Sequence, residues 1–314
     1  MSETQQGAAV QRLVDAVEGT ILGQRAVVES LVGAYASGGH VLLEGMPGLG
    51  KTLLARTFAD CLGVPFRRVQ FTPDLMPADL LGTNVFEASS QSFRLLKGPV
   101  FTQILMADEI NRTPPKTQAA LLEAMEEGQV TIDGEAHRLA EGFFVIATQN
   151  PIELEGVYPL PEAQLDRFQM RIRLDVPAKE AEIELYRRAL AGTLGAAPAE
   201  PALNADEALG LRQAAGAVHV ADELLDYLWR LAEAVRRSPH LEIGVSPRGA
   251  LALLGAARSS ALIEGRDFVL PDDLKRFLDA CWGHRILLQA ESELEGHTPA
   301  SVLSSLADEV EVPH

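Results

Sequence analysis

Residues 45–52 place glycines, a lysine and a hydroxyl group at the spacing that a phosphate-binding loop requires. The string reads Gly45-Met46-Pro47-Gly48-Leu49-Gly50-Lys51-Thr52 and matches the pattern G-x-x-x-x-G-K-[ST]. In such a loop the backbone N–H groups point toward an anion, and the lysine reaches the β- and γ-phosphates of a nucleotide. The threonine hydroxyl can ligate Mg²⁺. The string therefore predicts a site for nucleotide phosphates with a magnesium ion.

Two carboxylates follow an apolar segment further along the chain. Residues 104–107 read Ile-Leu-Met-Ala, and Asp108 and Glu109 come directly after them. In open α/β sheets ligands bind at the carboxyl ends of the strands, so we expect both side chains to face the loop at 45–52. We predict that Asp108 holds Mg²⁺, directly or through water. Glu109 is predicted to act as the general base that orients and polarises the attacking water.

Three further polar residues stand beside expected strands or helices. Asn150 follows the apolar run 143–148 and could hydrogen-bond a γ-phosphate or the attacking water, although by itself it better suits the start of a turn. Arg167 precedes the last apolar run, and Arg248 lies in the first turn of an expected helix. Taken alone, both arginines are typical of structural or surface positions. Their functional assignment depends on a wider pattern.

Short strands alternating with helices must position these residues. The apolar runs that predict strands lie at 40–44, 66–71, 104–107, 143–148 and 169–176. Helical segments separate them, which implies an α/β fold with a parallel sheet covered on both faces. Two hairpins are expected to interrupt this alternation, at 83–101 and at 129–139, the second with Asp133-Gly134 as its turn.

Before and after the strands the pattern is helical. Helices are predicted over the first twenty-odd residues and at 25–36, 178–191, 205–238, 246–264 and 271–289. The stretch 192–205, rich in Ala, Pro and Gly, is expected to be a flexible connection. These patterns predict an αβ nucleotide-binding core at 1–178 and an all-α domain at 179–314. For the acidic C-terminal tail, a short helix and a frayed end fit equally well.

Composition limits the classes of function. The chain has 314 residues and a net charge of −17, and it shows no basic stripe, so binding to nucleic acid is not expected. Apolar runs are too short for membrane insertion, and residues 1–7 do not resemble a secretory signal, so we expect a cytoplasmic protein. Cys61 and Cys281 are expected to be buried thiols. The histidines form no cluster with zinc-ligand spacing, so no structural zinc is predicted.

Together the motifs resemble those of the AAA+ ATPases, and specifically the MoxR family of the clade that carries an insert in the second core helix. The resemblance covers about residues 10 to 290. Beyond the phosphate loop, the matching strings are MADEINR at 106–112, PPKTQ at 114–118, ATQNP at 147–151, LPEAQLDRF at 160–168 and SPR at 246–248. The stretches 109–118 and 160–168 are the most family-specific. Thr113 and Gly249 depart from the pattern, since alanine is expected at both positions.

The resemblance implies a role for each matching residue. Lys51 and Thr52 would be the Walker A residues, Asp108 and Glu109 the Walker B pair, and Asn150 sensor 1. The segment 83–101 would be the helix-2 insert, and 129–139 the hairpin before sensor 1. The residues implied to contact ATP are Gly23, Gln24, Gly45, Met46, Pro47, Gly48, Leu49, Gly50, Lys51, Thr52 and Leu53.

The resemblance also implies that the two arginines complete the catalytic set. Arg167 would be an arginine finger that reaches the γ-phosphate bound by a neighbouring subunit. Arg248 would be sensor 2 on a helical lid, and the displaced lid of this clade can place it in trans. Gly23 and Gln24 would lie beside the adenine and read it largely through the backbone. Hydrolysis would then require an assembly of subunits.

The implied function is an ATP-hydrolysing ring, expected to be a hexamer, that remodels or activates a client protein. The resemblance further implies a partner with a von Willebrand factor A-type domain, while no residue identifies the client. One alternative is the ATPase subunit of a metal chelatase, and another is a nucleic-acid motor. The hairpin at 129–139 has no basic excess, which disfavours the motor. A non-hydrolysing switch would require a defect in the loop lysine or the two carboxylates, and all three are present.

Overall fold

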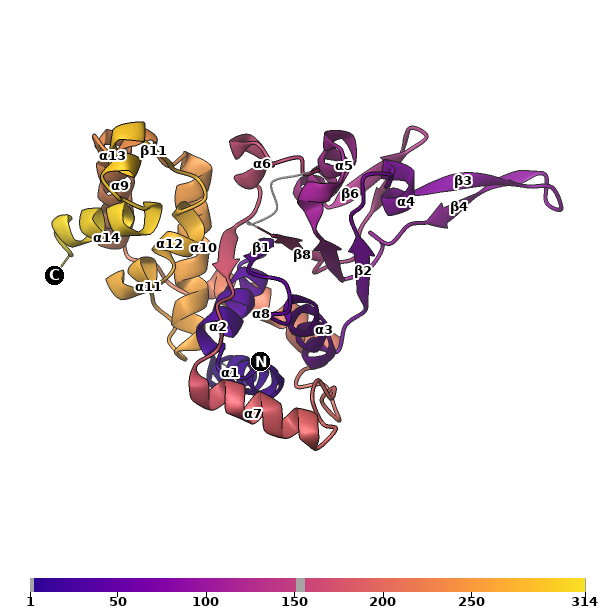
Figure 1. Ribbon diagram of the computed structural model, residues 1–314, viewed down its shortest axis with the longest axis horizontal. Helices are drawn as coiled ribbons and strands as arrows, with labels where there is room; N and C mark the ends of the chain where they lie inside the picture. Colours follow the sequence, from indigo (N-terminus) through magenta and orange to yellow (C-terminus); the bar gives the residue numbers. More distant parts are fainter. Residues whose placement is uncertain (1–2, 151–155, 314) are drawn as a thin grey trace.

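The computed structural model, which describes residues 3–150 and 156–313, is built around a parallel β-sheet. Its strands are β1 (Val41–Glu44), β2 (Phe66–Gln70), β5 (Ile104–Asp108), β8 (Phe144–Gln149) and β9 (Met170–Arg173). Their order across the sheet is β2-β5-β8-β1-β9, and all neighbouring pairs are parallel (Figure 1). The predicted parallel sheet is confirmed. Pro151, the last residue of the ATQNP string, lies outside the described residues.

Helices cover both faces of the sheet. Successive side chains of each central strand point to opposite sides, so apolar residues lie on both faces. Leu42 and Leu105 belong to one apolar cluster, which includes side chains of α4 and α5. Leu43 and Met106 belong to the other, with side chains of α1, α2 and α3. The covering helices are α1 (Glu3–Thr20), α2 (Arg25–Ala36), α3 (Lys51–Leu62), α4 (Pro77–Leu81) and α5 (Pro115–Glu127). A 3₁₀ turn, η1 (Ile110–Arg112), and α6 (Glu162–Leu165) complete this half.

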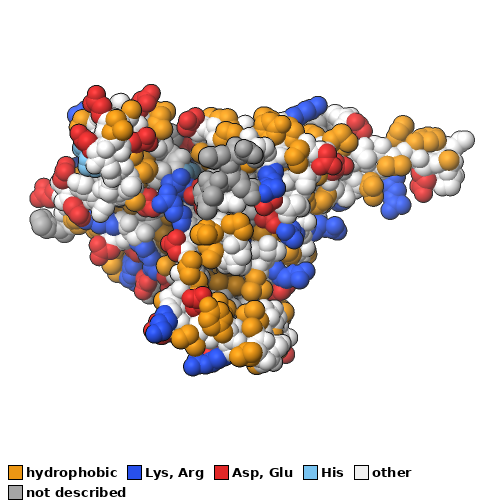
Figure 2. Space-filling view, viewed as in Figure 1, with side chains coloured by type: hydrophobic (Ala, Val, Ile, Leu, Met, Phe, Trp, Pro, Cys, Tyr) orange, Lys and Arg blue, Asp and Glu red, His pale blue; other side chains and the backbone are white. Residues whose placement is uncertain are grey.

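Two antiparallel hairpins leave the core where the sequence predicts them. One consists of β3 (Gly82–Glu87) and β4 (Ser92–Lys97) and projects away from the sheet (Figure 1). Figure 2 shows hydrophobic side chains along this projection, where Phe86 and Phe93 are exposed and their ring centroids lie 5.4 Å apart. The other consists of β6 (Gln129–Ile132) and β7 (Glu135–Arg138). Its turn residues Asp133 and Gly134 both have positive φ, as a type I′ turn requires.

The second half of the chain is mainly helical. It contains α7 (Lys179–Leu190), α8 (Ala205–Ala217), α9 (Asp222–Arg237), α10 (Pro247–Ile263), α11 (Pro271–Arg276), α12 (Leu278–Trp282), α13 (Ala290–Leu294) and α14 (Pro299–Glu309). A short ladder pairs β10 (Leu241–Ile243) with β11 (Leu287–Leu288). The C-terminal tail is therefore largely helical. The division into domains at 178/179 stays a prediction.

Two of the predicted long helices are interrupted. The expected helix at 205–238 breaks between α8 and α9, where His219 donates its N–H to the carbonyl of Asp267 at 2.7 Å and accepts from the N–H of Val269 at 3.0 Å. These hydrogen bonds to a distant loop replace the helical ones, which local sequence does not reveal. The expected helix at 271–289 ends at Trp282, and the chain then enters β11.

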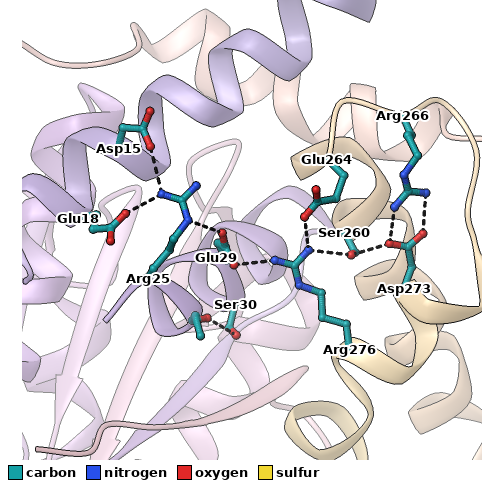
Figure 3. Close-up of polar contacts among 11 residues, drawn as sticks. Asp15, Glu18, Arg25, Glu29, Ser30, Ser260, Glu264, Arg266, Asp273 and Arg276 are labelled. Atoms are coloured by element: carbon teal, nitrogen blue, oxygen red, sulfur yellow. Dashed lines mark hydrogen bonds and ion pairs between the residues drawn. The ribbon is translucent and has the colours of Figure 1, made fainter. Parts of the chain in front are cut away.

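The helical half is attached to the core by apolar packing and by ion pairs. Helices α8 and α10 contribute to the same apolar cluster as α1 and α2. Figure 3 shows the polar part of this contact: Arg276 of α11 reaches Glu29 of α2 at 2.6 Å and Glu264 at 2.8 Å. Arg25 reaches the same Glu29 at 3.0 Å. The two halves therefore share a continuous interface.

Cys61 and Cys281 are buried as predicted, and burial raises the pKa of their thiols to about 11 and about 12. Within residues 3–150 and 156–313, no helix is both long enough and apolar enough to cross a bilayer.

Candidate functional site

The phosphate-loop string connects β1 to α3, as its sequence predicts. Helix α3 begins at Lys51, and Gly48 and Gly50 both have positive φ, near +87° and +83°. A Cβ added to Gly45 would lie 2.8 Å from the carbonyl oxygen of Leu174, the residue after β9, so only glycine fits at this position. The loop backbone and the positive end of α3's dipole form a cradle that suits phosphate.

Residues predicted to bind phosphate, bind the metal ion and activate water line one cleft of about 450 Å³, which we call the phosphate cleft. Its walls are Pro47, Gly48, Leu49, Gly50, Lys51, Thr52, Leu53, Asp108, Glu109, Thr148, Gln149 and Asn150. Gly45 and Met46 do not line it, and their carbonyls accept hydrogen bonds from Nζ of Lys51, which does. The oxygen donors of Thr52 and Asp108 are the kind that Mg²⁺ prefers, so this cleft fits the ion.

Asp108 is held in place by two partners that the sequence analysis did not single out. The hydroxyl of Thr148 donates to Oδ1 at 2.5 Å. Arg68, on the neighbouring strand β2, donates to Oδ2 from Nε at 3.0 Å and from Nη2 at 2.6 Å. The Asp108 residue is only 7% exposed, so these charge-assisted bonds set the orientation of its carboxylate.

Glu109 has an unusual backbone conformation. Its φ is +57°, in the left-handed region that a non-glycine residue adopts at a cost. Its N–H donates to the hydroxyl of Thr148 at 2.9 Å. Its carboxylate accepts from Nε2 of Gln70 at 2.5 Å and lies 3.1 Å from Nε of Arg112. Thr148 thus bridges the two acids, and a hydroxyl inside a buried strand is the signal that could have identified it.

A second, mainly apolar pocket of about 390 Å³ adjoins the phosphate loop. It shares Gly48, Leu49, Gly50 and Leu53 with the cleft, and its other walls come from residues 20–22, from Gln24 and from side chains within 176–177 and 182–194. Gln24 lines it and donates to the carbonyl of Asp175 at 2.7 Å. Gly23 lies just outside the wall, where a Cβ would meet that of Ala181 at 2.7 Å. The contribution of α7 was not predicted from the sequence, because α7 follows the predicted core 1–178.

The two predicted catalytic arginines lie together, but outside the phosphate cleft. Nη2 of Arg167 is 3.1 Å from one carboxylate oxygen of Glu126, and Nη1 of Arg248 is 3.3 Å from the other. Both line a separate cleft of about 320 Å³ between α5, the turn after α6 and the start of α10. Neither arginine lines the cleft that contains Lys51. The structure therefore brings the arginines together without bringing them to the phosphate loop of their own chain.

The described residues contain no cluster of three or more His, Cys, Asp or Glu side chains placed to hold a metal ion.

Comparisons with known proteins agree with this arrangement. The model of the ATPase family associated with various cellular activities (AAA) matches residues 40–170, and that of the AAA lid domain matches 233–306. Chaperone MoxR1 of Mycobacterium tuberculosis is 40% identical over 97% of this chain and 82% of that protein. Protein MoxR of Paracoccus denitrificans is 34% identical over 93% of each chain.

A solved structure extends the similarity to three dimensions. The crystal structure of a candidate ATPase from Cytophaga hutchinsonii matches with a TM-score of 0.91 at 37% identity, covering 99% of this chain and 97% of that one. The likeness therefore includes both the sheet with its phosphate loop and the helical half. On the strength of these matches, the chain belongs to the MoxR family of AAA+ ATPases.

Proposed function

We propose that this chain hydrolyses ATP as one subunit of a homo-oligomeric ring, a hexamer, and uses the cycle to remodel or activate a client protein. One observation carries this proposal. The phosphate loop, Asp108, Glu109 and Asn150 line one cleft, while Arg167 and Arg248 line another. Within one chain, the cleft that contains the phosphate loop is lined by neither Arg167 nor Arg248, and the cleft that these two arginines line contains no residue of the loop.

Within one subunit the division of labour follows from position. The loop N–H groups and Lys51 bind the phosphates, and the pocket beside Leu53 and Gln24 takes the adenine. Thr52 and Asp108 would hold Mg²⁺, which would supply neutralisation of the charge that develops on the phosphates. Glu109 orients the attacking water and accepts its proton. Asn150 lies at the tip of β8 and positions the water or the γ-phosphate.

A neighbouring subunit supplies the remaining charge. Arg167 and Arg248 both pair with Glu126 within their own chain, and Glu126 is a carboxylate that a γ-phosphate can replace. An arginine supplied in trans is worth about 10³–10⁵ in hydrolysis rate. Hydrolysis is thereby linked to the contact between subunits, which is what a conformational motor needs.

ATP turnover measured against protein concentration tests the ring proposal, with the size distribution recorded in parallel. For the wild-type chain, specific activity should rise as the assembly forms. Arg167→Ala should lose about 10³-fold or more of that activity while the assembly persists. Activity that is independent of concentration and unchanged in Arg167→Ala would show a self-contained ATPase and would refute the proposal.

We further propose that the ring acts in the cytoplasm with a partner that carries a von Willebrand factor A-type domain. The name Chaperone MoxR1, given to a relative with 40% identity, supports a chaperone-like role. Glu109→Gln should bind ATP without hydrolysing it and so hold the ring in its ATP state. Pull-down with this variant, with and without ATP, should recover the partner. Recovery of no such protein in either state would count against this part of the proposal.

A further inference from the structure

The side chain of Arg285 joins the helical half to the turn formed by residues 166–169. Only 3% of this side chain is exposed. Its Nε donates to Oδ1 of Asp166 at 2.6 Å, and its Nη2 donates to the carbonyls of Asp166 at 2.9 Å and Phe168 at 2.7 Å. Its Nη1 donates to the carbonyl of Gln169 at 3.0 Å. One buried guanidinium group therefore fixes both ends of the turn.

Other contacts hold the same guanidinium to the helical half. Nη1 also donates to the carbonyl of Cys281 in α12. His284, the preceding residue, has its Nε2 3.0 Å from the carbonyl oxygen of Phe168. Burial, and then the charge of Arg285, lowers the pKa of His284 well below its ordinary value, which favours the neutral imidazole. The buried positive charge of Arg285 is compensated by the carboxylate of Asp166, whose Oδ1 lies 2.6 Å from Nε.

Both arginines of the second cleft lie beside contacts of Arg285. Arg167 lies inside the turn that Arg285 holds. Arg248 precedes Gly249, where an added Cβ would lie 2.9 Å from Cδ of Arg285. Arg285 is thus packed between the two backbone segments that carry Arg167 and Arg248.

We propose that Arg285 is a positioning residue that holds Arg167 and Arg248 as one rigid unit, ready to meet the γ-phosphate of the neighbouring subunit. This inference rests on the proposed role of Arg167 in trans. Two arginines that must reach one phosphate lose less entropy on binding when their spacing is set beforehand. The forked guanidinium is needed for this, because a lysine ammonium offers no comparable planar set of donors.

Mixed assemblies test the inference. Arg285→Lys should lower kcat by about 10²-fold, the loss expected when a reacting group is displaced by about 1 Å. Its KM for ATP should stay close to the wild-type value, because the phosphate cleft of the same chain is untouched. Glu109→Gln has the opposite defect, namely an inactive site and intact arginines. Each interface of the ring joins the nucleotide site of one subunit to the arginines of the next. In a 1:1 mixture, about a quarter of the interfaces pair an intact site from Arg285→Lys with intact arginines from Glu109→Gln, so activity should return to about a quarter of wild type.

Three controls separate this inference from the proposed function and from misfolding. Arg167→Ala mixed with Glu109→Gln should also recover activity, and failure of that mixture would refute the role of Arg167 in trans. Asp166→Asn removes the negative charge that faces Arg285 but keeps an acceptor oxygen, on a side chain that is 25% exposed, so it should fold and give a smaller loss of kcat that the same mixing restores. Arg266→Lys weakens a comparable ion pair of the helical half, to Asp273, without touching the turn, and should retain turnover (Figure 3).

The outcomes are distinct. Complementation by both Arg167→Ala and Arg285→Lys supports the inference. If Glu109→Gln complements Arg167→Ala but neither Arg285→Lys nor Asp166→Asn, Arg285 does not position the arginines. The inference is likewise overturned if Arg285→Lys and Asp166→Asn both retain wild-type kcat. In either case the role of Arg167 in trans still stands.

Discussion

Replacing Thr148 by valine should disturb both acids of the phosphate cleft at once. The Thr148 hydroxyl is the only described group that bonds both acids, because it donates to Asp108 at 2.5 Å and accepts the N–H of Glu109 at 2.9 Å. Thr148 is fully buried, and valine has nearly the same shape as threonine. Thr148→Val therefore removes both hydrogen bonds without opening a cavity.

The magnitude follows from the partners left behind. Loss of a hydrogen bond to a charged acceptor costs about 1.5–3 kcal/mol, and a buried N–H left without a partner costs about 1–3 kcal/mol. Arg68 continues to donate to Asp108, which lowers the first contribution. We therefore expect Thr148→Val to lose about 2–4 kcal/mol of the free energy of unfolding. Glu109 loses the bond that holds its left-handed backbone, so kcat should fall by about 10–100-fold.

Urea unfolding and ATP turnover measure the two effects, and Thr148→Ser is the matched control. Serine keeps the hydroxyl and both bonds and loses one methyl group, which costs about 1 kcal/mol. It should therefore hydrolyse ATP at nearly the wild-type rate. If the valine and serine variants have equal stability and equal kcat, the hydroxyl does not orient the acids, and the reasoning is wrong.

Three further predictions concern other parts of the molecule. Burial lowers the pKa of His40 to about 4 in the folded chain. Between about pH 6.5 and pH 4 the unfolded chain therefore binds one more proton at this residue than the folded chain, and the free energy of unfolding decreases as the pH is lowered. The loss from this group should be about 2 kcal/mol at pH 5, and urea unfolding at pH 7.5 and 5 should show a smaller loss for His40→Gln. Gly249→Ala should lower the free energy of unfolding by about 1–3 kcal/mol, because the new Cβ would lie 2.5 Å from Cγ2 of Val245 and 2.9 Å from Cδ of Arg285. Thermal unfolding measures this loss, and an unchanged melting temperature would refute the tight packing. Lys51→Met should abolish the stabilisation by Mg-ATP, about 2.7 kcal/mol at a hundredfold excess over Kd, whereas a wild-type shift in this variant would exclude Lys51 from phosphate binding.

Several features were predictable because the information is local. The phosphate loop is contiguous, and its glycines, Lys51 and the following helix form the cradle without help from distant residues. The hairpin at 129–139 was predictable for the same reason, since Asp133-Gly134 adopts its turn conformation independently of context. The position of Asp108 and Glu109 followed from a general property of parallel sheets, whose carboxyl ends meet at one edge.

Features that depend on distant contacts were not predictable in this way. The predicted helix at 205–238 breaks because the backbone of His219 finds partners in a loop nearly fifty residues away. The roles of Arg68 and Gln70 depend on β2 lying next to β5, and a single exposed arginine or glutamine in a strand carries no sign of its neighbour.

The sequence by itself determined the family, the parallel sheet and the position of the phosphate-loop motif between β1 and α3, because short-range spacing encodes them. Only the tertiary structure decided that Arg167 and Arg248 share one carboxylate, away from the phosphate loop of their own chain. Only it placed Arg285 between them. The physical reason is that a buried guanidinium needs several acceptors at fixed positions, and the fold alone brings backbone carbonyls from distant segments into that arrangement.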